Sequence, residues 1–124
     1  MVAPTSAKII FRCDGLPMNT TTVDHEEIAR FDELAKGWWD PDGPMRPLHQ
    51  LNPVRLTYIR DSLCLHFDRA PLASKPFGGL RLLDIGCGAG LLSEPLRRLG
   101  ADVVAIDAAG EVIDAARRHA ELVE

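Results

Sequence analysis

The sequence predicts an α/β fold in which N-terminal helices precede one βαβα unit of a parallel sheet. Two short apolar runs, residues 80–85 and 102–106, have the length and composition of buried parallel strands. Each run is followed by a segment whose apolar residues recur at helical spacing. Between the first run and its helix lies a turn that contains Gly86, Gly88 and Gly90. This order of elements forms a unit whose crossover is right-handed.

The composition is that of one small globular domain. The chain has 124 residues, of which 46% are hydrophobic, and its formal net charge is −4. This charge argues against a nucleic-acid partner, which needs a basic face. The three cysteines show no CxxC spacing and the four histidines no ligand pattern, so we expect neither a disulfide framework nor a metal site. No apolar run is long enough to span a bilayer.

Residues 1–22 are interpreted as an N-terminal extension outside the domain. Their apolar stretch, Ile9-Ile10-Phe11, is too short for a signal-peptide core. We expect a disordered segment. Two alternatives remain open: translation begins at Met18 and the preceding residues are mispredicted, or the segment is a weak mitochondrial presequence.

A first helix is predicted from Asp24, whose carboxylate suits the N-cap, to about Lys36, with Gly37 ending it. The stretch 38–53 is predicted to be a loop because it is rich in Pro and Gly. Its adjacent Trp38 and Trp39 are interpreted either as pins that hold the loop on the core or as a wall of a ligand pocket.

A second helix is predicted to begin at Asn52-Pro53, with Leu56, Ile59, Leu63 and Phe67 on one face. After the glycine turn, residues 91–99 are predicted to be helical and closed by Gly100. The last helix is predicted over 111–123, and its inward positions are Val112, Ile113, Ala116 and Ala120. Two strands are too few for an independent doubly wound sheet, so we expect a truncated chain.

The glycine turn has the spacing GxGxG and not the dinucleotide pattern GxGxxG, because Leu91 follows Gly90. Such a turn lets a ligand approach the backbone closely, next to the free N–H groups of a helix N-terminus. Asp84 stands two residues before the first glycine, where a carboxylate suits an ammonium group and repels a pyrophosphate. The structural alternative is a tight turn whose glycines only relieve strain.

Asp107 follows the second strand, 17 residues after Gly90. An acid at this place can accept hydrogen bonds from both hydroxyls of a ribose. The alternative is an aspartate that caps the helix after Gly110. Together with the glycine turn, Asp107 favours a cofactor that contains adenosine.

The segment Leu82–Gly90 with Asp107 resembles the class I S-adenosylmethionine-dependent methyltransferases. Three upstream segments narrow the resemblance to the bacterial ubiquinone biosynthesis O-methyltransferases, and the likeness runs from about Thr22 to the C-terminus. These segments are Val23-Asp24-His25-Glu26-Glu27-Ile28-Ala29-Arg30-Phe31, Trp38-Trp39-Asp40 and Pro47-Leu48-His49-Gln50-Leu51-Asn52-Pro53-Val54-Arg55-Leu56.

The resemblance implies that residues 23–124 are the N-terminal part of a Rossmann-like methyltransferase domain, a partial class I methyltransferase fold. It implies S-adenosyl-L-methionine as the cofactor and places Arg55, Gly86 and Asp107 at cofactor-binding positions. The residue chemistry agrees, because Arg55 could pair with the methionyl carboxylate and Asp107 with the ribose. Together with the turn chemistry, the expected cofactor-binding set is Arg55, Asp84, Gly86, Gly88, Gly90 and Asp107.

The implied reaction is O-methylation of a polyprenyl catechol and of the demethylated quinol. The catalytic residues are unknown: His25 and His49 are the nearest candidate bases, but the likeness places no base in this part of the chain. The resemblance also implies a small-molecule polyprenyl phenol or quinol substrate, protein partners of ubiquinone biosynthesis, and a cytoplasmic protein with peripheral contact to the inner membrane.

Three other readings of the sequence stay open. The chain could bind S-adenosylmethionine without catalysing transfer, or methylate another small molecule. A nicotinamide-dependent oxidoreductase is the third, and the absence of GxGxxG counts against it.

Overall fold

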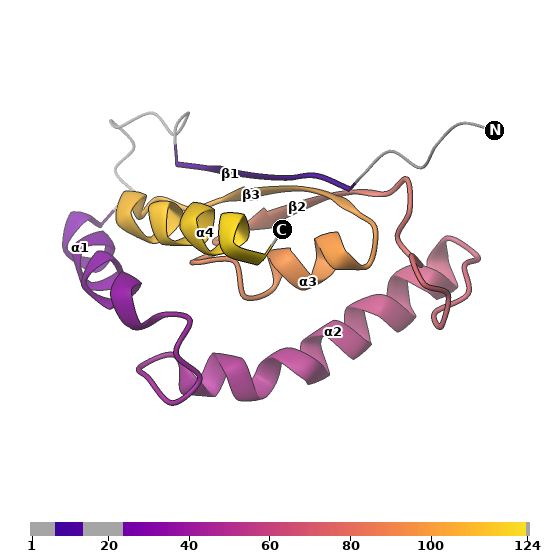
Figure 1. The fold of residues 1–124 in the computed structure, drawn as a ribbon, viewed down its shortest axis with the longest axis horizontal. Helices are drawn as coiled ribbons and strands as arrows, with labels where there is room; N and C mark the ends of the chain where they lie inside the picture. Colours follow the sequence, from indigo (N-terminus) through magenta and orange to yellow (C-terminus); the bar gives the residue numbers. More distant parts are fainter. Residues whose placement is uncertain (1–6, 14–23, 124) are drawn as a thin grey trace.

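The described part of the protein is a three-stranded parallel sheet with helices packed on one side of it (Figure 1). The computed structural model describes residues 7–13 and 24–123. The sheet has the order β1-β3-β2. In chain order, the elements are β1 (Ile9–Arg12), α1 (His25–Leu34), the 3₁₀ turn η1 (Ala35–Gly37), α2 (Arg46–His66), β2 (Arg81–Ile85), α3 (Ser93–Arg98), β3 (Asp102–Ile106) and α4 (Gly110–Val123).

The predicted βαβα unit is confirmed, and with it the partial class I methyltransferase fold. β3 has the predicted bounds, while β2 and α4 each differ by one residue at the start. α3 is shorter than the predicted helix over 91–99. All four predicted inward positions of α4 are buried: Val112, Ile113, Ala116 and Ala120.

The N-terminal strand β1 was not predicted. For Ile9–Arg12 the expectation of disorder is wrong, because these residues pair in parallel with β3, Ile9 opposite Val103 and Arg12 opposite Ile106. The alternating pattern turns Phe11 inward, where it is 5% exposed. Residues 1–6 and 14–23, including Met18, lie outside the described part of the chain.

Asp24 caps α1 as predicted, accepting hydrogen bonds from the amides of Glu26 and Glu27 at 2.9 and 3.3 Å. The start of α2 was predicted wrongly. The helix begins at Arg46, seven residues before Pro53, because Pro47 lies in the first turn, where its missing N–H costs nothing. Pro53 then lies inside the helix, and Asn52 is not its cap.

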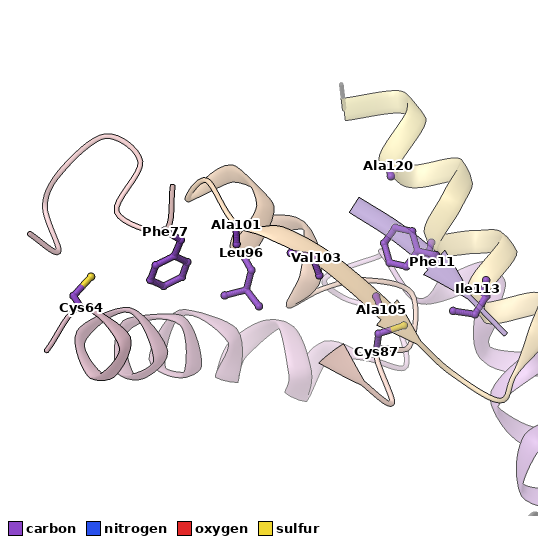
Figure 2. Close-up of a cluster of buried hydrophobic side chains, with 11 residues drawn as sticks. Phe11, Cys64, Phe77, Cys87, Leu96, Ala101, Val103, Ala105, Ile113 and Ala120 are labelled. Carbon is purple, nitrogen blue, oxygen red and sulfur yellow. The ribbon is translucent and has the colours of Figure 1, made fainter. Parts of the chain in front are cut away.

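The core lies between the sheet and the helices. Phe11, Val103 and Ala105 project from the strands into a cluster that also contains Ile113 of α4, Leu96 of α3 and Cys64 of α2 (Figure 2). A second cluster, around Trp38, Ala109 and Val112, joins η1 and its neighbouring loop to α4. These clusters fix the strand ends and the glycine turn relative to α1 and α2.

The opposite face of the sheet is bare and apolar. Ile10, Val104 and Leu83 stand side by side across the three strands, with exposed fractions of 52%, 39% and 60%. Both faces of a parallel sheet are normally covered. None of the helices in residues 24–123 combines the length and apolar character needed to cross a membrane.

Candidate functional site

A cavity of about 380 Å³ opens at the carboxyl ends of β2 and β3, where parallel sheets bind their ligands. Gly86 and Asp107 line the same cavity, so the turn and the acid face one crevice. One wall is apolar and comes from β2, β3 and the segment after β3: Ile85, Ile106, Ala108 and Ala109. The other lining residues come from α1 and its N-cap: Asp24, Glu27, Ile28 and Phe31.

Helix α1 is held in this position by α4. The carboxylate of Asp32 accepts a hydrogen bond from the amide of Glu111 at 3.0 Å, at the N-terminal end of α4. The rings of Phe31 and Trp38 lie 6.2 Å apart. The wall that α1 gives to the cavity therefore belongs to the packed structure.

A second cavity, of about 80 Å³, lies on the other side of the turn. Gly86 lines both cavities, and the second one brings together Arg55, Asp84 and Gly88. Trp38 and Leu48 close it with Cys87, Leu91 and Leu92. Five of the six predicted site residues thus line one or both cavities. The sixth, Gly90, lines neither.

Gly90 instead supports the core. A Cβ atom at Gly90 would lie 2.9 Å from the ring of Phe11. The expected ligand contact of Gly90 therefore has no support in the cavity geometry. Its small size serves the close packing of β1 against the turn.

The small cavity places two opposite charges next to each other. Burial raises the pKa of the Asp84 carboxyl, while the hydroxyl of Ser93, at 2.5 Å, and the charge of Arg55 act in the opposite direction. Arg55 donates from Nη2 to Oδ1 of Asn52 at 2.7 Å. Its buried Nε has no hydrogen-bond partner among the described residues. A buried unpaired donor is costly, so this atom is suited to an anionic ligand group.

Asp107 both lines the large cavity and holds the turn. Its Oδ2 accepts from the amide of Gly88 at 2.9 Å, and its Oδ1 accepts from the amide of Ala109 at 2.9 Å. The second bond is of the kind expected of an aspartate just before a helix. A carboxylate has about four lone-pair sites, so these two bonds leave acceptor capacity for a ligand.

Trp38 combines both roles considered for the tryptophan pair. It is 5% exposed, packs in the second core cluster and lines the small cavity. A Cβ atom at Gly88 would lie 2.5 Å from Cζ2 of Trp38. Gly88, with φ +56°, is thus required both by the turn and by the indole above it.

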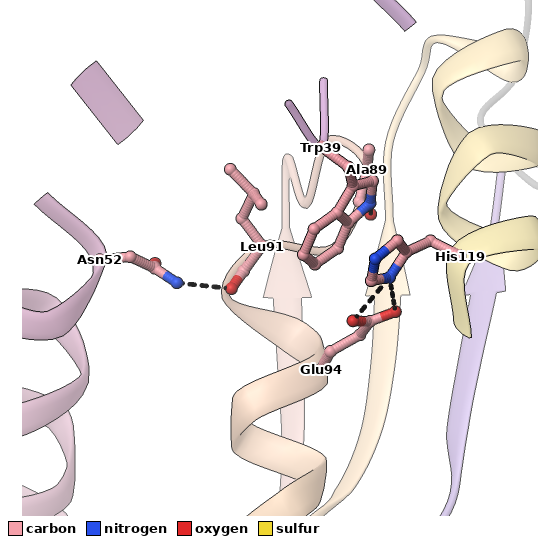
Figure 3. Close-up of polar contacts among 6 residues, drawn as sticks. All are labelled: Trp39, Asn52, Ala89, Leu91, Glu94 and His119. Atoms are coloured by element: carbon pink, nitrogen blue, oxygen red, sulfur yellow. Dashed lines mark hydrogen bonds and ion pairs between the residues drawn. The ribbon is translucent and has the colours of Figure 1, made fainter. Parts of the chain in front are cut away.

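The hydrogen bonds that side chains donate to carbonyls in and just after the turn could not be predicted from the sequence. Asn52 donates to the carbonyl of Leu91 at 2.7 Å, and Trp39 donates to that of Ala89 at 2.9 Å. Trp39 also stacks on His119, which contacts the buried Glu94 (Figure 3). The one sequence feature that pointed to this contact network was the pair of tryptophans in a polar loop. Glu94 and His119 are 25 residues apart, so no local pattern links them.

Neither candidate base lines the cavities. His25 is the exposed first residue of α1, and Nε2 of His49 lies 2.8 Å from the carbonyl of Trp38. Within residues 7–13 and 24–123, no group of three or more His, Cys, Asp or Glu side chains is placed to hold a metal ion. Burial, together with the charges of Asp107 and Asp84, raises the pKa of the Cys87 thiol to about 12, so this thiol is not activated as a nucleophile.

Comparisons with known proteins show which proteins the chain is similar to. Residues 82–123, from β2 to α4, match the family model described as "Methyltransferase domain". The ubiquinone biosynthesis O-methyltransferase of Chelativorans sp. (strain BNC1) is 60% identical over 100 residues, which are 81% of this chain and 40% of the relative. The corresponding protein of Cereibacter sphaeroides is 58% identical over 102 residues, 82% of this chain and 41% of the relative.

A plant relative extends the comparison. The mitochondrial ubiquinone biosynthesis O-methyltransferase of Arabidopsis thaliana is 50% identical over 104 residues, 84% of this chain and 32% of the relative. The chain thus spans about two fifths of the length of the bacterial relatives that it matches. The resemblance noted in the sequence is confirmed: over four fifths of its length, the chain is similar to part of the ubiquinone biosynthesis O-methyltransferases.

Proposed function

We propose that the chain binds S-adenosyl-L-methionine across the two cavities that meet at Gly86. The observation that carries the proposal is this division: Arg55 and Asp84 lie on one side of the turn and Asp107 on the other. A molecule with a charged amino-acid end and a nucleoside end matches the arrangement. The apolar wall beside Asp107 suits an adenine ring.

The charged groups fit the methionyl end of this cofactor. The unpartnered Nε of Arg55 is suited to its carboxylate, and Asp84 to its ammonium. Asp107 would accept hydrogen bonds from the ribose hydroxyls with the lone pairs that the turn leaves free. When bound, the cofactor supplies an electrophilic sulfonium methyl group. The contribution of the chain is to bind and orient it.

We further propose that the whole protein is an O-methyltransferase of ubiquinone biosynthesis that acts on polyprenyl catechol and quinol hydroxyls. The names of the relatives support this proposal. Peripheral contact with the inner membrane would follow from the apolar tail of such a substrate. On its own, the chain is proposed to bind cofactor without transferring methyl groups, because it matches only about two fifths of the length of the bacterial relatives.

Isothermal titration with S-adenosylmethionine tests the binding proposal. The wild type is expected to bind, and Asp107→Asn to bind at least about 10-fold more weakly, since hydrogen bonds to a charged group contribute about 1.5–3 kcal/mol. Asp114→Asn is the matched control, because it removes an exposed charge of α4 away from both cavities. Binding of NADH in place of S-adenosylmethionine would overturn the proposal.

A methyl-transfer assay with a catechol acceptor tests the second part. No product is expected from the 124-residue chain. A longer chain that spans the full length of the relatives is expected to methylate the acceptor. A full-length protein that binds the cofactor but leaves every catechol unmodified would contradict the proposed reaction.

A further inference from the structure

A stack of three side chains contacts the glycine turn through the carbonyl of Ala89. It consists of Trp39 from the loop after η1, His119 from α4 and Glu94 from α3 (Figure 3). None of the three lines either cavity. We refer to them as the Trp39 stack.

Glu94 fixes the inner end of the Trp39 stack. Its side chain is 0% exposed, and a buried carboxylate requires a partner. Nδ1 of His119 lies 2.8 and 3.0 Å from the two carboxylate oxygens, so one ring nitrogen faces both of them. The contact joins α3, which follows the turn directly, to α4.

The imidazole of His119 positions the indole of Trp39. The ring centroids are 3.5 Å apart and the planes differ by 1°, which is close parallel stacking. His49 meets the same indole edge-on at 6.3 Å. With its ring held on two sides, Trp39 directs Nε1 at the carbonyl of Ala89 and donates to it at 2.9 Å.

The carbonyl of Ala89 is a sensitive point of the turn. It lies between Gly88 and Gly90, both of which have positive φ, so no side chain restricts the backbone dihedrals on either side. Asp107 holds the same turn through the amide of Gly88. The Trp39 stack and Asp107 therefore restrain adjacent residues of one short segment.

We propose that Trp39, held by His119 and Glu94, is a positioning residue that sets the geometry of the turn for the ligand. This inference rests on the proposed function. Trp39 lines neither cavity; it acts through the Ala89 carbonyl on Gly86 and Gly88, which do line them. The residue thereby determines how well the turn fits the cofactor.

The test begins without ligand, so that it decides the inference even if the proposed cofactor is wrong. Trp39→Phe keeps an aromatic ring on His119 but removes the N–H donor. Faster hydrogen exchange is expected at the amides of residues 88–90, with unchanged exchange in β3. Unchanged exchange in the turn would overturn the inference.

The second measurement is the affinity for S-adenosylmethionine. Trp39→Phe is expected to weaken binding about 2- to 10-fold, the range of one lost hydrogen bond between uncharged groups, and Trp39→Ala at least as much. The control is Ile59→Val in α2, which is expected to lower stability to a similar extent and to leave the affinity unchanged.

The outcomes separate the two proposals. A Trp39→Phe variant that binds as tightly as wild type overturns the positioning role, whatever its exchange rates. A loss of affinity equal to that of Ile59→Val assigns Trp39 to stability alone and also overturns it. If the wild type binds no S-adenosylmethionine, the proposed function fails, and the exchange measurement alone decides whether Trp39 sets the turn.

Discussion

Replacing Gly88 by alanine tests the packing of the glycine turn most directly. Alanine at φ +56° costs about 1–2 kcal/mol, because its Cβ crowds the backbone in the left-handed region. The added Cβ would also lie 2.5 Å from Cζ2 of the buried Trp38. Overpacking of this kind costs about 1–3 kcal/mol. Together the two effects lower the free energy of unfolding by about 2–5 kcal/mol.

Gly86→Ala separates the two effects. Gly86 has φ +72°, but a Cβ there meets nothing within 4 Å. This variant is expected to lose only the backbone contribution, about 1–2 kcal/mol. Denaturation with urea, followed by circular dichroism, gives both values. The difference between the variants measures the contact with Trp38.

A double-mutant cycle tests whether the cost of Gly88→Ala comes from contact with Trp38. Trp38→Leu frees space above residue 88, so Gly88→Ala is expected to cost less in that background than in wild type. A Gly88→Ala variant that is no less stable than Gly86→Ala would refute the reasoning. Equal costs of Gly88→Ala in both backgrounds would refute it as well.

Three further predictions concern β1, the thiols and the pH dependence of binding. Phe11→Ala is expected to lower the free energy of unfolding by about 3–5 kcal/mol in urea denaturation. Ile10→Ala, on the bare face of the sheet, is expected to have a much smaller effect. Equal effects of the two variants would show that β1 is not packed as described. A thiol reagent at about pH 8 is expected to modify the exposed Cys13 and to leave Cys87 unmodified, because the pKa of about 12 leaves Cys87 almost no thiolate. Mass spectrometry of the labelled peptides measures this, and faster labelling of Cys87 than of Cys13 would contradict it. Binding of S-adenosylmethionine is expected to weaken as the pH falls through the raised pKa of Asp84, because the protonated carboxyl no longer attracts an ammonium group. Binding titrations between about pH 4 and 7 measure this dependence. An Asp84→Asn variant that keeps the full pH dependence would contradict the prediction.

Elements whose pattern is local could be predicted from the sequence. The buried positions of α4 follow from helical spacing, and β3 from an apolar run between a loop and an acid. The shared crevice of Gly86 and Asp107 follows from topology, since parallel strand ends meet at one edge. The start of α2 was missed because Pro47 and Pro53 look like loop residues, although proline is accepted in a first turn.

Features that depend on distant partners could not be predicted. β1 has only four residues, and its pairing with β3 joins segments about ninety residues apart. The Trp39 stack brings together three chain segments, and nothing local to Glu94 distinguishes it from an exposed helix residue. The small cavity likewise depends on α2 lying beside the turn, which brings Arg55 to Asp84.

The two hydrogen bonds that Asp107 accepts from backbone amides have a consequence for ligand recognition. Because the amides of Gly88 and Ala109 already restrain the carboxylate, the nucleoside of the proposed cofactor would meet an acceptor whose rotamer is fixed beforehand. Little side-chain freedom is then lost on association, which favours affinity. The hydrogen bond from Gly88 to Asp107 also couples ligand binding to the stability of the turn. A ligand that holds the Asp107 carboxylate in place also holds the backbone at Gly88, so a bound nucleoside is expected to protect the turn against local unfolding.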